Sequence, residues 1–164
     1  VRVGAGRGEL EGGGGEAGVG RSAEDFVNGK MVRGVFSEVR DLVFRLHESG
    51  CEVWAVSSTS EWVIQAGMKH FGIPANRILA AAVVTEEGKV TDQVVRVPSG
   101  KGKPLAIREV IARTPDAVFG NSIWDADMLE IARHPFAINP TPELLAIAAG
   151  RGWPVYHPEA VTGS

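Results

Sequence analysis

Short apolar runs alternate with amphipathic stretches along most of this 164-residue chain, and this alternation limits the folds that it can adopt. Apolar residues recur at helical spacing over residues 32–49, and Gly50 follows them. An unbroken apolar run within residues 52–57 then indicates a buried strand. Strands that alternate with helices in this way predict an α/β fold, with a mostly parallel sheet covered by helices.

The remaining elements extend the same pattern. Residues 78–85 and 90–97 are strand-like and flank Glu-Glu-Gly-Lys at 86–89, which is typical of a β-hairpin. Pro104 suits the first turn of a helix, where a missing amide costs little. We expect further helices over 61–71, 104–113, 125–133 and 142–149, and further strands over 117–119, 136–139 and 154–156.

The first part of the chain differs in composition. Nine of its 21 glycines fall within the first 20 residues, and such a segment buries too little apolar surface to offset its ordering entropy. We therefore predict a disordered tail over residues 1–24 and a single domain over residues 25–164. Gly4 and Gly6 suggest a dinucleotide-binding loop, but Glu9 stands where the third glycine belongs, and no strand precedes the loop. A nucleotide-dependent oxidoreductase is therefore a weak alternative.

The composition indicates which binding partners and which cellular compartment to expect. An apolar fraction of 44% and a charged fraction of 23% are ordinary for a soluble globular protein. The net charge of −3 gives no electrostatic reason to expect nucleic acid or an anionic membrane as partner. The single cysteine, Cys51, fits a reducing compartment, and no apolar run has the length of a membrane span. We predict a cytoplasmic protein, with its oligomeric state left open.

Residues 119–129 hold a polar cluster between two apolar runs. Gly120, Asn121 and Ser122 suit a tight turn after a strand, and Asp125 follows in the first turn of a helix, where the helix dipole favours a carboxylate. In open α/β sheets, ligands bind at the carboxyl ends of strands, where this turn is expected. The alternative is an ordinary strand–helix junction with a capping acid.

Residues 120–129, Gly-Asn-Ser-Ile-Trp-Asp-Ala-Asp-Met-Leu, also resemble the fourth motif of the haloacid dehalogenase-type (HAD) hydrolases, most of all their phosphoserine phosphatase-like branch. In that motif a glycine precedes one acid, and a second acid follows a few residues later. Asn121 stands at the first acid position and Asp125 at the second, while Asp127 is an extra carboxylate. The resemblance implies a Rossmann-like core with its active site at the carboxyl ends of the strands.

A serine-rich turn follows the first predicted core strand. Hydroxyl groups and free backbone amides at the start of a helix can bind an anion. The second motif of HAD hydrolases is a serine or threonine at this place, and Ser57 matches it, with the backbone amide of Ser58 beside it. The resemblance makes both residues phosphate ligands. The alternative is a serine-rich helix cap, for which Ser60 is suited.

A lysine-containing loop precedes the third core helix. Phosphoryl transfer needs a fixed cation against the charge on the phosphate oxygens. The third HAD motif is such a lysine at a helix start, and Lys103 matches it best, with Lys101 as the alternative. The resemblance therefore implies that Lys103 and Ser57 are catalytic and hold the phosphate.

The first HAD motif, Asp-x-Asp-x-Thr or Val, does not occur in this sequence. In the family its first aspartate is the nucleophile and its second is the general acid and base. We therefore expect a core that lacks its first strand and most of the cap, so that the strands flanking the gap have unpaired edges. A truncated gene product and a pseudoenzyme both fit this expectation.

The resemblance implies an Mg²⁺-dependent phosphomonoester hydrolase acting on a small phosphorylated metabolite, with Asn121 and Asp125 at the metal. An amide oxygen is a neutral and weaker ligand than a carboxylate, so Asn121 predicts weaker Mg²⁺ binding. The alternative function is a catalytically inactive protein that binds phosphate or a partner. Trp62 and Trp124 lie next to the predicted site and suit either the core or a substrate pocket.

Overall fold

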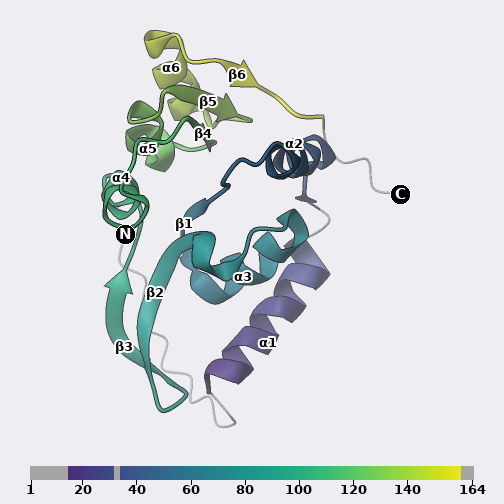
Figure 1. Ribbon diagram of the computed structural model, residues 1–164, viewed down its shortest axis with the longest axis vertical. Coiled ribbons are helices and arrows are strands. Elements are labelled where there is room, and N and C mark those ends of the chain that lie inside the picture. The colour runs from purple at the N-terminus through teal and green to yellow at the C-terminus, as the bar shows by residue number, and fades with distance from the viewer. Residues whose placement is uncertain (1–14, 32–33, 160–164) are drawn as a thin grey trace.

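The structure is a computed structural model that describes residues 15–31 and 34–159. Its first half contains two helices before the first strand, and then a strand–helix–hairpin unit (Figure 1). In chain order the elements are α1 (Glu16–Phe26), η1 (Val27–Met31), α2 (Ser37–Glu48), β1 (Ala55–Ser60), α3 (Glu61–Met68), η3 (Lys69–Phe71), η4 (Ala75–Arg77), β2 (Ile78–Glu86) and β3 (Lys89–Arg96).

The second half alternates short helices with strands. The helix predicted over 104–113 begins earlier, at Gly102, and continues from α4 into the π-turn η5. In chain order the elements are α4 (Gly102–Ala106), η5 (Ile107–Ile111), β4 (Ala117–Gly120), η6 (Ile123–Asp125), α5 (Ala126–Glu130), β5 (His134–Ile138), α6 (Pro142–Arg151) and β6 (Val155–Tyr156).

The strands form two three-stranded sheets, with orders β1-β2-β3 and β4-β5-β6. β1 pairs in parallel with β2, and β4, β5 and β6 are parallel throughout. β2 and β3 form the antiparallel hairpin. The predicted α/β class, the dominance of parallel pairing and the hairpin are confirmed. Instead of one sheet, however, the described residues form two, because no described strand pairs with the second edge of β1 or of β4.

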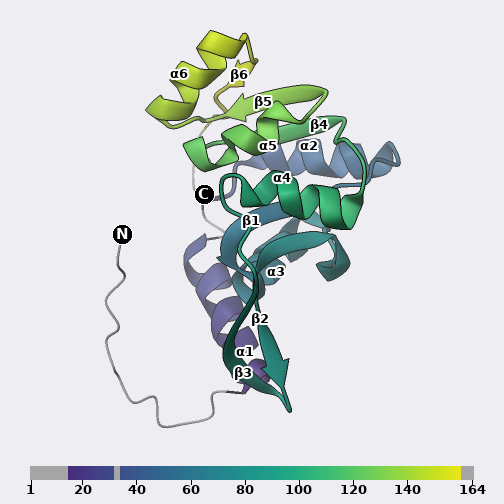
Figure 2. The ribbon, with the colours of Figure 1, turned by 90° about the vertical axis from the view of Figure 1, so that its left-hand side faces the viewer.

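Alternation along β2 builds two apolar layers, one on each face of the first sheet. Leu79 belongs to a core cluster with Ile107, Leu129 and Leu144, which come from η5, α5 and α6. Its neighbours in sequence face the opposite way and pack against α3, and Ala80 is among them. Figure 2 shows α4 and α5 in front of the strands, with α2 and α3 lying further back. The strands are therefore sandwiched between helices, and their carboxyl ends remain available for a site.

Helix α1 contradicts the predicted disordered tail over residues 15–24. Ala23 and Val27 are buried, and α1 lies along α3 (Figure 1). The glycines that suggested disorder are concentrated before residue 16, whereas Val19, Ala23 and Val27 recur at helical spacing. Docking of this apolar stripe on α3 stabilises the helix. Residues 1–14, the rest of the predicted tail, lie outside the described residues.

Within residues 15–31 and 34–159, no helix combines the length and apolarity needed to cross a membrane.

Candidate functional site

A buried ion pair lies where the two sheets meet. Lys103 in α4 and Asp125 at the end of η6 are 7% and 5% exposed, and they are the charged residues that the described chain buries. The ammonium of Lys103 donates a hydrogen bond to Oδ1 of Asp125. It also donates to the backbone carbonyl of Val56 in β1, at 3.3 Å. One lysine therefore connects the first sheet to the turn that follows β4.

The second oxygen of Asp125 is held by the turn itself. Oδ2 accepts hydrogen bonds from the backbone amides of Asn121 and Ser122, at 2.9 and 3.0 Å, and from the Ser122 hydroxyl at 3.3 Å. Burial raises the pKa of Asp125, but the hydrogen bond and charge of Lys103 and the two backbone amides lower it more, so the pKa lies below its usual range. Asp125 is thus a fixed anion that orients Lys103.

Two glycines allow this close arrangement. A Cβ at Gly120 would lie 2.7 Å from Cβ of Asp125 and 3.2 Å from Cδ1 of Leu129. A Cβ at Gly102 would lie 2.9 Å from the carbonyl oxygen of Val97. Side chains at either position would push the ion pair out of place. Gly120, the glycine of the predicted fourth motif, is therefore needed for the Asp125 turn to pack in this way.

The serines predicted to bind phosphate lie in the middle of β1, between Val56 and Ser60, where its register with β2 shifts. Ser57 directly follows Val56, whose carbonyl receives the Lys103 hydrogen bond. Ser57 is half-buried, and its hydroxyl oxygen accepts a hydrogen bond from the amide of Thr59 at 3.1 Å, while Ser58 is exposed. The structure thus brings Lys103 next to the serine segment, although 46 positions separate Ser57 from Lys103 in the sequence.

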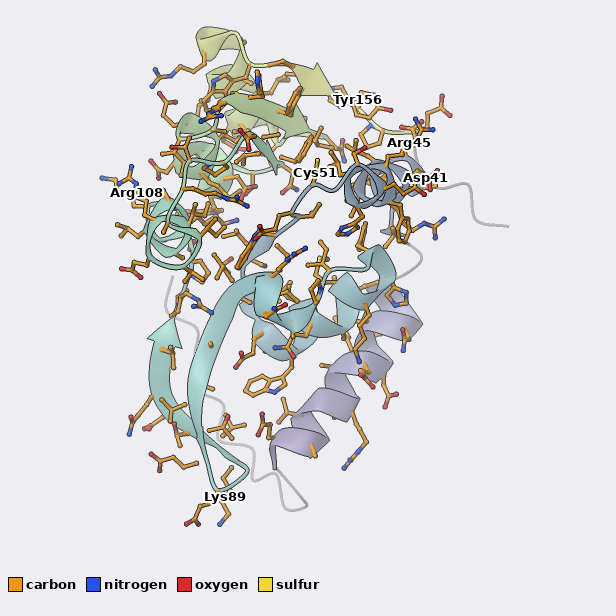
Figure 3. The ribbon with its side chains drawn as sticks, viewed as in Figure 1. Asp41, Arg45, Cys51, Lys89, Arg108 and Tyr156 are labelled. Carbon is orange, nitrogen blue, oxygen red and sulfur yellow. The ribbon has the colours of Figure 1, made fainter. Side chains whose placement is uncertain are left out.

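The two candidate lysines differ in their surroundings. Lys101 is exposed, whereas Lys103 is buried and paired. Two other cations lie away from the site: Figure 3 shows Lys89 at the tip of the β2–β3 hairpin and Arg108 on the outer side of the helix that follows Lys103. The geometry therefore favours Lys103 over Lys101 as the cation of this site.

The aromatic residues beside the site also differ. Trp124 is 63% exposed and so is not part of the core, and Trp62 is half-buried. A Cβ at Gly100 would lie 3.7 Å from Trp124, which places this ring beside the loop that leads into α4. Trp124 therefore lies at the surface, beside the loop that precedes Lys103.

The predicted metal ligands do not form a metal site by themselves. Asn121 is exposed after β4, and its carbonyl oxygen on the backbone accepts a hydrogen bond from the amide of Thr141 at 2.8 Å. Both carboxylate oxygens of Asp125 already bind donors of the protein. Within the described residues no three His, Cys, Asp or Glu side chains lie close enough to hold a metal ion. Mg²⁺ would therefore need further oxygen ligands.

Sequence reasoning missed the contact that organises the site. Asp125 was expected at a metal, but its direct partner is Lys103. The carbonyl of Val56, the other acceptor of the Lys103 ammonium, carries no signal in the sequence because every residue has such a group. The positions of Asp125 after one strand and of Lys103 at the start of another helix could have suggested this ion pair only once the order of the strands in space was known.

Comparison with known proteins shows which proteins this chain resembles. No family model matches the chain. A probable phosphatase of Mycobacterium tuberculosis is 33% identical over 126 residues, which cover 74% of this chain and 43% of that protein. A histidinol-phosphatase of Neisseria meningitidis is 28% identical over 129 residues, covering 73% of this chain and 58% of that protein. The chain thus spans about half the length of these curated relatives.

Solved structures share the fold. A protein of unknown function from Bordetella pertussis superposes with a TM-score of 0.78 at 22% identity, covering 87% of this chain and 67% of that one. A phosphoserine phosphohydrolase-like protein from Francisella tularensis gives a TM-score of 0.62 at 17% identity, covering 86% and 66%. A phosphoserine phosphatase with a phospho-aspartyl intermediate analogue gives 0.56 at 14% identity, covering 90% and 74%. The chain therefore has the fold of the HAD-type hydrolases and resembles their phosphoserine phosphatase-like branch.

Proposed function

We propose that this chain carries the phosphate-binding part of a phosphomonoester hydrolase that acts on a small phosphorylated metabolite. The observation that carries the proposal is the buried Lys103, which Asp125 fixes beside Val56 and the serines of β1. A cation that is oriented in advance and shielded from water stabilises the charge of a transferring phosphoryl group far better than a mobile surface lysine. The phosphatases among its relatives support the same class of reaction.

The roles of the site residues in phosphate binding follow from the hydrogen-bond donors that each of them has available. An ammonium has three N–H groups, and Val56 and Asp125 receive two of those of Lys103, which leaves a third for a phosphate oxygen. The hydroxyl of Ser57 and the backbone amide of Ser58 would donate to the other oxygens. Asp125 would act through Lys103, as a positioning residue, because its own oxygens are already engaged.

Magnesium dependence is part of this proposal through the family resemblance. The exposed side chain of Asn121 could offer one oxygen, but the described residues around it do not complete a magnesium site. Carboxylates from polypeptide outside the described residues would have to supply the remaining ligands.

A second function, phosphate binding without turnover, is favoured by one observation on the sequence. The motif Asp-x-Asp-x-Thr or Val, which holds the nucleophile in the HAD family, does not occur in it. Covalent phosphoryl transfer needs that carboxylate, whereas binding by Lys103 and Ser57 does not. The two functions therefore share the phosphate site and differ in turnover.

Two measurements test the proposal and separate these functions. Binding of inorganic phosphate is measured by isothermal titration calorimetry, and turnover with p-nitrophenyl phosphate in the presence of Mg²⁺. We expect phosphate binding that Lys103→Ala abolishes, that Ser57→Ala weakens and that the matched control Lys101→Ala preserves. Turnover with the same dependence supports the hydrolase, and binding without turnover supports the second function. Equal phosphate binding by the natural chain and the three variants would show that phosphate does not bind at Lys103 and Ser57.

A further inference from the structure

A cavity lies between helices α5 and α6, apart from the Lys103 site. Figures 1 and 2 both show α5 between α4 and α6, so the cavity is on the side of α5 that faces away from α4. Its volume is about 440 Å³. Sites for small molecules usually measure about 300 to 1,000 Å³, so the two helices enclose enough space for a small ligand.

Apolar side chains form part of the wall of this cavity. Ala126 of α5, Ile147 of α6 and Trp153, which follows α6, line it and are half-buried. Trp153 also packs against the core cluster around Leu129 and Leu144, so the core holds its ring in place. An indole ring offers apolar contact area and attracts organic cations to its face.

Gly150 keeps the space between these walls open. It lies in α6 and lines the cavity, and a Cβ at this position would meet no atom within 4 Å. A large side chain at residue 150 would therefore take up part of the cavity without a clash. This makes Gly150 the position at which the cavity can be filled by substitution.

The charged side chains that line the cavity leave one negative charge without a partner. Glu130 and Arg151 form an ion pair at 3.2 Å and neutralise each other. Asp127 is exposed, and its carboxylate makes no ion pair with any residue that the structure describes. The cavity is therefore complementary to a ligand with a single positive charge.

Asp127 also lies beside the loop that leads into α4. A Cβ at Gly100 would lie 3.9 Å from Oδ2 of Asp127, so this carboxylate is close to the loop. The carbonyl of Gly100 accepts a hydrogen bond from the amide of Lys103 at 3.0 Å. A ligand bound to Asp127 would change the surroundings of Gly100, so binding can be followed at this residue.

We propose that the cavity between α5 and α6 binds a small organic cation, an aliphatic primary ammonium. Asp127 accepts hydrogen bonds from the ammonium and balances its charge, while Ile147 and Trp153 cover its apolar stem. A neutral alcohol of the same length lacks the attraction to Asp127, and a carboxylate is repelled by it. The site is separate from the proposed phosphate site, and binding to it requires no turnover.

Binding is measured on the full chain by two-dimensional ¹H–¹⁵N NMR at constant ionic strength. The probes are butylammonium, 1-butanol and butyrate, which have similar size and differ in charge. We expect butylammonium to shift the indole signal of Trp153 and the amide signals of Gly100 and Asp127, with a dissociation constant in the millimolar range. The other two probes should bind at least about threefold more weakly. Equal binding of all three, or no saturable shift at these residues, would overturn the proposal.

Three variants locate the site. Asp127→Asn keeps the size of the side chain, removes its charge and should weaken butylammonium binding by at least about threefold. Gly150→Leu should abolish binding, since the new side chain fills the cavity. Gly67→Leu is the matched control, because Gly67 also lies in a helix, α3, its Cβ also meets nothing within 4 Å, and it does not line the cavity.

We expect Gly67→Leu to bind butylammonium like the natural chain. If Gly150→Leu does not fold, the comparison of Asp127→Asn with the natural chain still decides. An affinity that Asp127→Asn leaves unchanged would show that the cation does not bind at this carboxylate, and the proposal would then be wrong.

Discussion

The ammonium of Lys103 and the carboxylate of Asp125 meet in the interior, although 22 positions separate them in the sequence. Through this contact α4, the turn after β4 and the carbonyl of Val56 are joined at one point. The same side chain is therefore the proposed phosphate ligand and the connection between the two sheets. Changes at this pair are expected to affect both stability and ligand binding.

Removal of one partner should destabilise the protein strongly. Lys103→Met leaves the Asp125 carboxylate buried without its cation, so we expect a loss of about 3 kcal/mol or more in the free energy of unfolding, measured in urea. The double variant with Lys103→Met and Asp125→Leu should lose much less than the sum of the single variants, because no buried charge remains. Lys101→Met, at an exposed position, should change the free energy by at most about 0.5 kcal/mol. Additive losses would contradict a direct interaction.

Acidic pH should reduce the contribution that the Asp125 carboxylate makes to the stability of the fold. The folded state lowers the pKa of Asp125 below the ordinary value of 3.8, despite the opposing effect of burial. A group with a lowered pKa stabilises the fold above its unfolded value, and this stabilisation is lost as the pH falls through the folded pKa. The difference in unfolding free energy between the natural chain and Asp125→Asn should therefore be constant from about pH 8 to about pH 5 and shrink below about pH 4. A difference that grows toward acid would contradict the sign of the shift.

Gly120→Ala tests the packing of the Asp125 turn. The new methyl group would lie 2.7 Å from Cβ of Asp125, so the turn must move, and we expect a loss of about 1–3 kcal/mol in urea unfolding. Gly150→Ala is the matched control, since its Cβ meets nothing within 4 Å and the residue lies in helix α6. That change should be neutral or stabilise by up to about 1 kcal/mol. Equal effects at both glycines would show that the close contact is unimportant.

Asn121→Asp tests the proposed magnesium role. In a chain to which the Asp-x-Asp-x-Thr motif has been restored, an added carboxylate should strengthen Mg²⁺ binding on the order of tenfold, measured by calorimetry in the presence of inorganic phosphate. Asp127→Asn serves as the control, because Asp127 is exposed and not required by the motif, and it should leave the affinity unchanged. Unchanged or weaker Mg²⁺ binding by Asn121→Asp would remove this position from the metal shell.

Val27→Ala tests whether the N-terminal helical segment belongs to the folded domain. Val27 is 2% exposed, so its truncation leaves a cavity, and we expect about 2 kcal/mol of destabilisation in a single cooperative unfolding transition. Exposed Met31→Ala, in the same turn, should have a much smaller effect. A chain whose stability is indifferent to Val27 would have a segment that does not pack on the domain.

Most elements after residue 36 were predictable because their signals are local. Apolar periodicity, the hairpin at residues 86–89 and the proline at the start of the helix after Lys103 all act within one turn or strand. The segment around α1 was mispredicted because its stability depends on α3, which lies more than 30 positions further along the chain. Composition averaged over a glycine-rich stretch conceals a helix whose apolar stripe is stabilised by tertiary packing.

The sequence by itself determined the α/β class, the strand–helix junctions and the residues that line them, since spacing and turn chemistry suffice for these. The tertiary structure decided that Lys103 pairs with Asp125, that Lys101 stays exposed, and that the strands separate into two sheets. These outcomes depend on contacts between distant segments, whose energies no local pattern records. The residues of the site could thus be nominated one by one, but their partners became known only from the fold.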